Sequence, residues 1–479
     1  MTARSLRASV LGLGGALALV ATGCGGSKTG ASSMSAASLV RSGATAFVSI
    51  DSDTGSSQWK QLDSLAQKFP GRALAIIALK AQLAQHGVDY DKDVKPALGP
   101  QVDIAVVQGP APSDTSFAVL TKPDDGGKFE ALVKKLNSSG GSGSQAVFRK
   151  VGDWYALSET DQMIGRVLAA KGGKTLAGDS SFKDAFGKLP GSALVKAYVN
   201  PHQLGTLIKQ SGTPYGSAAA AFDKLDFISA ALSAESDGIR VHGAAQGSGA
   251  GTILGSGDYS SKLLTQAPGD AFAFLTFRGG ASLSSAFRAL GRPLTSLAGI
   301  KPDELAALLE NETALWARPG AVIPEFTAIL QPKDVNAGLA TLDKLARLLA
   351  RFSSGTFKPG SERTIDFGQF ALHYGASNGK IVITSAAGGV GGSGGSGEKL
   401  PSSADFKEAK SAAGLPDSTN GFVYIDLKNA IPLIEAFAGL SGSSVPPVVA
   451  DNLRPLRSLL AWSAGSGNTR TFDAFLEIK

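Results

Sequence analysis

The chain has 479 residues, of which 43% are hydrophobic and 18% are charged, and its formal net charge is +6. A chain of this length exceeds what one hydrophobic core usually organises, so we expect two or more domains. The apolar content predicts packed cores rather than general disorder. The mild charge, without a basic stripe interleaved with aromatic residues, argues against a nucleic-acid partner.

Residues 1–23 have the organisation of an export signal. Arg4 and Arg7 give a positively charged start, and the apolar run that follows is much shorter than the ~20 residues of a membrane span. The small-residue triplet ending at Gly23 leads into Cys24, and this junction resembles the lipobox of bacterial lipoproteins. The resemblance implies cleavage after Gly23 and attachment of acyl chains to the sulfur of Cys24. A simple signal peptide cut nearby, or an uncut signal anchor, is the alternative interpretation.

Cys24 is also the only cysteine of the chain, so no intramolecular disulfide can form. Residues 24–36 are small and polar, and we expect them to form a flexible tether between the lipid and the folded protein. These features predict a lipid-anchored protein on the extracytoplasmic face of the cell membrane. The membrane is then a partner through the acyl chains on Cys24.

The rest of the chain indicates an internal duplication, because two halves run through the same segments in the same order. Each half has an Ala-Phe strand, then a strand, a Pro turn and an amphipathic helix, then a Phe-Lys helix with a Leu-Pro turn, and finally two strands joined by a glycine-bearing turn. The paired segments are Leu39–Asp51 with Leu263–Phe277, Ser116–Leu136 with Glu325–Leu345, Trp154–Ser158 with Lys380–Thr384, Phe182–Asn200 with Phe406–Asp426, and Leu225–Gly243 with Leu456–Ile478.

We therefore expect two tandem α+β domains, residues 37–247 and 258–479, separated near the aperiodic stretch Gly247–Gly257. Strands such as the one at Tyr424 are apolar on both faces, which predicts central positions in a mostly antiparallel sheet that helices cover. The helix after Lys333 repeats apolar side chains at steps of three and four, so one of its faces is expected to pack on the sheet.

No catalytic set is recognisable, so we expect neither an enzyme nor a cofactor. Ser57 and Lys60 have the spacing of penicillin-binding enzymes, but the companion motifs are absent or lie in the tether, and Ser57 as a helix cap is the simpler interpretation. Gly391–Gly395 fits a nucleophile elbow and Gly389–Gly394 fits a dinucleotide loop, as many glycine and serine tracts do. The first half has a helix-like segment here, Glu159–Ala170, which favours a local replacement by linker.

The spacing of the histidines does not support a metal site. They are far apart in sequence, and none has a second histidine, a cysteine or a close carboxylate at ligand spacing. The four are His86, His202, His242 and His373.

Two groups of carboxylates have simple structural interpretations. Asp89, Asp91 and Asp93 alternate as in a calcium loop, but the segment lacks the glycine and the terminal glutamate of an EF-hand. Asp124 and Asp125 precede a helix, where acidic side chains favour the positive end of the helix dipole. No metal is therefore expected at either place.

The segment Ala73–Leu83 predicts an unusual helix, since it is apolar nearly all round apart from Lys80 and Gln82. A helix of this kind is buried or lines something apolar. We expect a packed core helix, with an apolar ligand groove as the alternative.

The opening of the folded part, residues 39–71, resembles a family of exported bacterial proteins known only as a domain of unknown function. The resemblance rests on the Ala-Phe strand that ends at Asp51, on Trp59, and on a helix that closes at Phe69-Pro70-Gly71. It spans most of the mature chain and implies an envelope location and a duplicated α+β fold. It assigns no catalytic residue.

These features together predict a non-enzymatic binding or scaffolding lipoprotein of the cell envelope, with an envelope protein as a partner. Two alternatives stay open. One is a carrier of a lipid or another apolar ligand, for which the helix at Ala73–Leu83 is the motive. The other is a cell-envelope hydrolase whose site is assembled from distant residues.

Overall fold

The computed structural model describes residues 34–109, 114–139, 145–210, 220, 222–255, 257–279, 295, 299–321, 323–368, 370–395, 397–440 and 445–479. It combines helices with antiparallel strands, so the expected α+β class is confirmed. The expected signal, including Gly23, and the expected acylation site Cys24 lie outside the described residues. The first described helix, α2 (Met34–Ala37), has Ala36 and Ala37 buried, so the folded part begins before the expected boundary at residue 37.

The chain divides into two compact units. Unit 1 comprises Met1–Ser211, Asp226–Ala244 and the terminal Lys479, and unit 2 comprises Gly212–Leu225 and Ala245–Ile478. The division falls close to the stretch where a domain boundary is expected. That stretch is not without structure, because it contains the short helix α10 (Ala250–Leu254).

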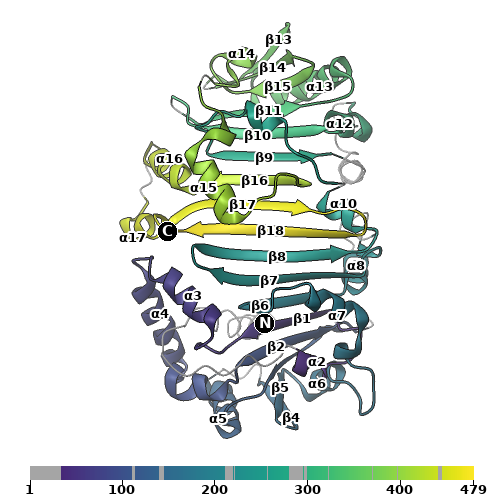
Figure 1. The fold of residues 1–479 in the computed structure, drawn as a ribbon, viewed down its shortest axis with the longest axis vertical. Coiled ribbons are helices and arrows are strands. Elements are labelled where there is room, and N and C mark those ends of the chain that lie inside the picture. The colour runs from purple at the N-terminus through teal and green to yellow at the C-terminus, as the bar shows by residue number, and fades with distance from the viewer. Residues whose placement is uncertain are drawn as a thin grey trace. The chain divides into compact units, whose positions relative to one another are not determined.

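Unit 1 is built on an antiparallel sheet with β1 near its centre (Figure 1). Its strands are β1 (Ala46–Asp51), β2 (Gln101–Val107), β3 (Ser116–Thr121), β4 (Val147–Val151), β5 (Trp154–Ser158), β6 (Val195–Val199), β7 (Phe227–Glu235) and β8 (Gly238–Gln246). The strands pair in the order β4-β5-β3-β2-β1-β6-β7. A tight turn at Ser236 and Asp237 then leads from β7 into β8.

Unit 2 is also built on an antiparallel sheet. Its strands are β9 (Ala273–Arg278), β10 (Glu312–Arg318), β11 (Glu325–Leu330), β12 (Thr356–Lys358), β13 (Glu362–Asp366), β14 (Ala371–Ser377), β15 (Lys380–Thr384), β16 (Gly421–Asp426), β17 (Leu456–Ala464) and β18 (Thr469–Ile478). They pair in the order β12-β13-β14-β15-β11-β10-β9-β16-β17-β18.

The strand order of unit 1 recurs in unit 2. Strands β1, β2, β3, β4, β5, β6 and β7 take the same places as β9, β10, β11, β14, β15, β16 and β17, and β12 and β13 extend one edge of unit 2. The bounds of β5 and β15 coincide with two segments that the sequence pairs, Trp154–Ser158 and Lys380–Thr384.

The helices are distributed over both units. In unit 1 they are α2, α3 (Ser57–Ala66), α4 (Arg72–Gln85), α5 (Gly126–Ser139), α6 (Asp161–Val167), α7 (Ser180–Gly187) and α8 (Pro201–Gln210). In unit 2 they are α10, α12 (Pro302–Leu308), α13 (Val335–Ser353), α14 (Gly389–Gly392), α15 (Ala404–Ala413), α16 (Leu427–Leu440) and α17 (Pro447–Leu453). Short 3-10 or π turns are η1 (Tyr90–Val94), η2 (Lys95–Ala97), η4 (Leu176–Gly178), η5 (Leu263–Gln266) and η6 (Leu400–Ser402). None of the described helices combines the length and the apolarity that crossing a bilayer demands.

Helices cover both faces of each sheet, as strands that are apolar on both faces require. In unit 1, α2, α6 and α7 pack on the face that carries Tyr198, and α5 packs on the opposite face, at Tyr155. In unit 2, α15 packs on the face that carries Tyr424, and α13 packs on the opposite face, at Tyr374. Each unit therefore has a core on either side of its sheet.

An equivalent aromatic contact fixes α7 and α15 to their sheets. The ring of Phe182 meets that of Tyr198 edge to face at 5.3 Å, and the ring of Phe406 meets that of Tyr424 edge to face at 5.1 Å. Such pairs contribute about 0.5–1.5 kcal/mol beyond the burial of their area. The Phe-Lys helices that the sequence pairs are thus docked on β6 and β16 in the same way.

Unit 1 contains a carboxylate that is fully shielded from solvent. Asp103 of β2 is 0% exposed, and its two oxygens accept hydrogen bonds from Gln101 Nε2 at 2.7 and 2.8 Å. Burial raises the pKa of Asp103 to about 7, although the hydrogen bonds from Gln101 and Ser49 oppose this effect. Because the charged form is disfavoured in the folded state, protonation of Asp103 stabilises the fold.

The buried carboxyl predicts that stability falls as pH rises. An unfolded Asp titrates near 3.9, so the wild-type free energy of unfolding should decrease between about pH 4 and about pH 7, by up to about 4 kcal/mol. Asp103→Asn removes this loss, so the variant should be the more stable protein at pH 8, with a difference that shrinks toward pH 4. Urea unfolding across this range measures both profiles. Asp237→Asn, in the turn between β7 and β8, is the control, and identical profiles for Asp103→Asn and wild type would contradict the assignment.

Candidate functional site

An apolar groove lies in unit 2 between α13 and strands β13, β14 and β15. Its volume is about 350 Å³, which is within the range of about 300–1,000 Å³ that small-molecule sites occupy. The α13 groove, as we call it, is lined by Leu342, Leu345, Ala346, Leu348, Leu349 and Phe352 of the helix and by Ile365, Leu372, Tyr374 and Ile383 of the strands.

The groove exists because the apolar face of α13 is wider than its contact with the sheet. Asp334 caps the start of the helix by accepting a hydrogen bond from the Ala337 backbone N–H at 3.0 Å, and Ala346 is buried against the strands. Leu349 and Phe352, in the last turns, are 45% and 73% exposed. Large apolar side chains left in water beside a hollow are typical of a binding surface.

The lining of the groove offers no free charge. Tyr374 carries its only polar group, and this hydroxyl donates a hydrogen bond to Asp343 Oδ1 at 2.8 Å. Arg363 Nε lies 2.8 Å from the same carboxylate oxygen. Burial and the bond to Asp343 raise the pKa of Tyr374, so the phenol stays neutral. The groove therefore suits an uncharged, apolar group.

Helix α4 corrects the expectation for Ala73–Leu83. The helix forms, but none of its residues is buried, and Leu74 and Ile77 are 62% and 63% exposed. The reason is that α5 and η1 already fill this face of the sheet, through Phe129 and Val94 among others. The prediction of a packed core helix is therefore wrong, and α4 is instead an apolar surface.

Ser57 and Lys60 lie on α3 but do not form a catalytic pair. Both side chains are exposed, and no hydrogen bond joins them. The cap of α3 is Ser56 and not Ser57, since the Ser56 hydroxyl accepts the hydrogen bond from the Trp59 backbone N–H at 3.3 Å. Asp51 holds Ser56 in place by accepting from its hydroxyl at 2.6 Å.

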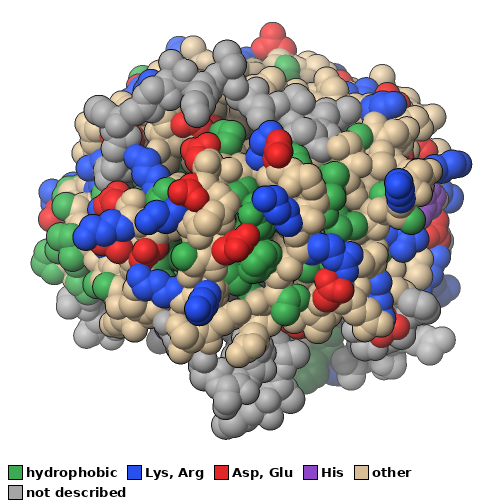
Figure 2. Space-filling model, turned by 90° about the horizontal axis from the view of Figure 1, so that it is seen from below, with side chains coloured by type: hydrophobic (Ala, Val, Ile, Leu, Met, Phe, Trp, Pro, Cys, Tyr) green, Lys and Arg blue, Asp and Glu red, His purple; other side chains and the backbone are tan. Residues whose placement is uncertain are grey.

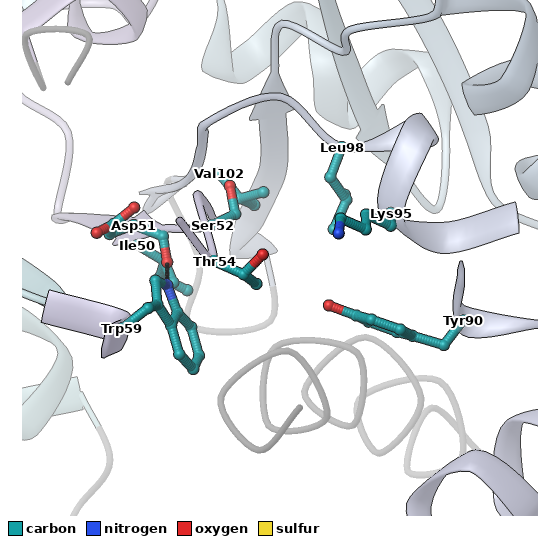
Figure 3. Close-up of a pocket in the computed structure, with 9 residues that line it drawn as sticks. All are labelled: Ile50, Asp51, Ser52, Thr54, Trp59, Tyr90, Lys95, Leu98 and Val102. Atoms are coloured by element: carbon teal, nitrogen blue, oxygen red, sulfur yellow. Dashed lines mark hydrogen bonds between the residues drawn. The ribbon is translucent and has the colours of Figure 1, made fainter. Parts of the chain in front are cut away.

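The small cavity beside α3 has room only for water. Trp59 and Tyr90 lie on opposite sides of it (Figure 3), and Trp59 Nε1 donates to the Asp51 carbonyl at 2.8 Å. Its volume is about 20 Å³, close to the minimum of about 10–15 Å³ that one water needs. A substrate site beside Ser57 is not supported by this geometry.

The histidines lie on separate elements. His86 follows α4, His202 is in α8, His242 is in β8, and His373 of β14 places Nδ1 3.1 Å from Glu362 Oε1. Within the described ranges, no three His, Cys, Asp or Glu side chains gather as metal ligands would.

The acidic runs are engaged in structural contacts. Asp89 caps η1 by accepting from the Lys92 backbone N–H at 2.9 Å, and Asp91 pairs with Lys80. The hydrogen bond from Lys135 to Asp93 holds the pKa of that carboxyl below its usual range. Of the pair Asp124 and Asp125, which is expected to favour the positive end of a helix dipole, Asp125 lies at the start of α5. It accepts a hydrogen bond there from the Lys128 backbone N–H at 3.0 Å.

Charges of both signs are mixed on the surface at the α5 and β4 end of unit 1 (Figure 2). Several of them pair there, with Lys122 and Asp153 2.9 Å apart and Arg149 and Asp161 2.6 Å apart. An alternation of signs gives no extended field that would attract one kind of charged partner.

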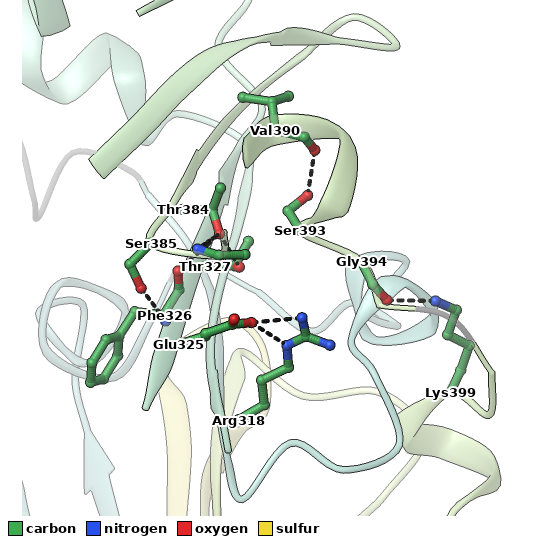
Figure 4. A network of polar contacts seen from close by, with 11 residues as sticks. Arg318, Glu325, Phe326, Thr327, Thr384, Ser385, Val390, Ser393, Gly394 and Lys399 are labelled. Carbon is green, nitrogen blue, oxygen red and sulfur yellow. Dashed lines mark hydrogen bonds and ion pairs between the residues drawn. The ribbon is translucent and has the colours of Figure 1, made fainter. Parts of the chain in front are cut away.

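The glycine tract is not a nucleophile elbow. Ser393, the serine of the Gly391–Gly395 match, is buried, and its hydroxyl donates to the Val390 carbonyl at 2.8 Å (Figure 4). The tract forms α14 and the turn after it. It also borders a hollow on the face of the sheet opposite the α13 groove.

Comparisons with known proteins assign no function to these sites. No family model matches the chain, and no curated protein matches it. The chain is similar to crystal form IV of TP0453, with 11% identity and a TM-score of 0.26 over 45% of this chain and 81% of the other. It is also similar to crystal form III of TP0453, with 8% identity and a TM-score of 0.17 over 72% and 90%. Both scores are too low to establish a shared fold, and the resemblance to an uncharacterised exported family stays a prediction.

Proposed function

We propose that the chain is a lipid-anchored envelope protein that binds an apolar ligand, such as one acyl chain, in the α13 groove. The observation that carries this proposal is the apolar lining of the groove together with the exposure of Leu349 and Phe352 at its edge. Each methylene group moved from water into such a surface contributes about 0.8 kcal/mol. A few methylenes therefore supply enough free energy for binding without any charged contact.

The remaining features fit binding better than catalysis. The only polar group that lines the groove, the Tyr374 hydroxyl, is bonded to Asp343, and the side chains of Ser57 and Lys60 are exposed on α3 with no hydrogen bond between them. The lipobox-like junction at Cys24 and the duplication of an α+β domain that the sequence indicates complete the proposal. An acyl anchor would hold the protein at a membrane, where apolar ligands are abundant.

Apolar binding is tested with Phe352→Asp. A charge at the exposed edge of the groove should weaken the binding of N-phenyl-1-naphthylamine, an uncharged fluorescent probe, by about tenfold or more, because the carboxylate must be desolvated when the probe enters. Fluorescence titration gives the dissociation constant. Since Phe352 is exposed, the fold should tolerate the change.

Ile434→Asp is the matched control, because Ile434 of α16 is 65% exposed and does not line the groove. It should bind the probe as wild type does. Equal affinity in wild type and Phe352→Asp would overturn the proposed site.

The anchor is tested with Cys24→Ser in the bacterial host. Loss of the thiol removes the acceptor for acyl chains, so the variant should move from the membrane fraction to the soluble exported fraction. Treatment with globomycin, which blocks lipoprotein signal cleavage, should instead retain an uncleaved precursor. Membrane association of Cys24→Ser equal to that of wild type, or signal cleavage that continues under globomycin, would contradict the anchor.

The exposure of α4 favours a second candidate function, a scaffold that contacts a protein partner through this helix. A photo-crosslinking residue at Ile77 should give one discrete adduct in intact cells, because an apolar patch in water gains most from being covered. The same residue at Lys60, on the neighbouring helix, is the control and should give none. Equal labelling at the two positions would count against a partner at α4.

A further inference from the structure

A second hollow lies on the face of the unit 2 sheet opposite the α13 groove. Its volume is about 330 Å³. The Trp316 pocket, as we call it, has Trp316, Ile329 and Val382 as its apolar floor, and it is flanked by Lys380, Lys399 and Gly394. The floor residues share one face of the sheet. Ile329 of β11 pairs with Val382 of β15 on one side and with Ala314 of β10 on the other. Trp316 is two residues from Ala314 along β10, so its side chain lies on the same face.

The pocket is open because α14 is built almost entirely of glycine. At the same place in unit 1, α6 follows β5 and packs on β2, β3, β4 and β5, and its Ile164 and Val167 are fully buried. In unit 2, α14 follows β15 and packs mainly on β14 and β15, and Val390 is its only residue with an apolar side chain beyond Cβ. The strands beneath, β10 and β11, receive less apolar cover from α14 than β2 and β3 receive from α6, although Ile329 and Val382 are still only 3% and 4% exposed.

The floor of the pocket also differs from the equivalent surface of the unit 1 sheet. By register, Trp316 stands opposite Phe274 on β9 as Ala105 stands opposite Phe47 on β1. A large flat indole therefore occupies the position that a methyl group occupies in unit 1. Trp316 is 3% exposed, so its ring presents only a small surface to the pocket.

The charged side chains that line the Trp316 pocket have one sign. Lys380 and Lys399 line it, and no Asp or Glu does. Lys399 Nζ donates to the Gly394 carbonyl at 2.8 Å, which fixes this ammonium at the wall of the pocket (Figure 4). Lys380 forms no ion pair with any described residue of the chain. Two cations that line a partly apolar hollow attract an anion. No carboxylate of the lining competes with that anion for the two lysines.

The equivalent place in unit 1 is also cationic. A hollow of about 610 Å³ lies there, lined by Arg41, Arg149 and Lys174 and by no acidic residue. This hollow is formed by the segment before the first strand, the β4–β5 hairpin and the segment after α6. The Trp316 pocket is formed by the corresponding parts of unit 2, which are η5, the β14–β15 hairpin and the segment after α14. In unit 1, however, Arg149 is paired with Asp161 and the floor is filled by α6.

We infer that the Trp316 pocket binds a small organic anion, one that carries a phosphate or carboxylate beside a flat apolar group. The anionic group would pair with Lys380 and Lys399, and the apolar group would lie over Trp316, Ile329 and Val382. The site is separate from the α13 groove, whose lining has no cation, and it does not depend on the proposed apolar ligand.

The test compares 1-naphthyl phosphate with 1-naphthol by isothermal titration calorimetry of the full chain. Wild type should bind the phosphate ester more tightly than the uncharged parent. Lys380→Gln should weaken binding of the ester about tenfold and leave the affinity for 1-naphthol unchanged, because one charge-assisted contact is lost. Lys407→Gln, an exposed lysine of α15, is the control and should behave as wild type.

A second pair of variants tests the hollow while both lysines are kept. A Cβ at Gly394 meets nothing closer than 3.8 Å, so Gly394→Leu should fold and should abolish binding by occupying the hollow. A Cβ at Gly391 has open space around it and does not face the pocket, so Gly391→Leu should bind normally. Wild-type affinity in Gly394→Leu and Lys380→Gln, or failure of wild type to bind 1-naphthyl phosphate, would overturn the proposal.

The source of the anion is distinguished with vesicles. Unacylated Cys24→Ser protein is offered phosphatidylcholine vesicles with and without phosphatidic acid. Binding that requires both phosphatidic acid and Lys380 supports the site and assigns its anion to a lipid headgroup. Absence of vesicle binding, with binding of 1-naphthyl phosphate retained, supports the site and assigns its anion to a soluble molecule.

Discussion

Strands that are apolar on both faces need cover on both faces, and the architecture of this chain follows from that constraint. A strand of this kind carries buried side chains toward two cores, as β15 does with Ile381 on one face and Val382 on the other. Helices supply the cover in both units, and the edge-to-face contacts of Phe182 and Phe406 fix two of these helices in equivalent places. Where a helix covers less than the strands expose, a hollow remains.

Unit 2 has incomplete cover on either side of its sheet. On one side, α13 leaves Leu349 and Phe352 in water at its last turns, and the resulting groove is apolar throughout. On the other side, the glycines of α14 leave a hollow between two lysines, above the buried Trp316. The two hollows differ in chemistry because one is bounded by an amphipathic helix and the other by backbone and by lysine side chains. One sheet can therefore present an apolar and a cationic site without the two competing.

The sequence predicts the elements of the fold better than it predicts what covers them. Local patterns locate β5 and β15 to the residue, and they also give the Phe-Lys helices and the role of Asp125 at the start of α5. The prediction for α4 fails because an apolar helix signals a need for burial but not whether a face is available, and here α5 already occupies it. Ser57 is misassigned as the cap for a smaller reason, since its neighbour Ser56 is an equally good capping residue by type.

Both candidate sites depend on information that local patterns do not contain. The apolar face of α13 is visible in the sequence, but the part of it that extends beyond the sheet is decided by where β13 and β14 end. The glycine tract is visible too, and in isolation it is indistinguishable from a linker. Its effect emerges only when α14 is compared with α6, whose Ile164 and Val167 show what the tract fails to cover.

The strand pairing beneath α14 is made by backbone hydrogen bonds, so it places few demands on the side chains that form the floor. Ile329 and Val382 belong to the buried core and must stay apolar, whereas Lys380, Lys399 and Gly394 at the rim can change while the sheet keeps its register. The selectivity of this hollow can therefore change without a change of fold. Relatives of this protein would then differ most at those rim positions and least along β9 and β16.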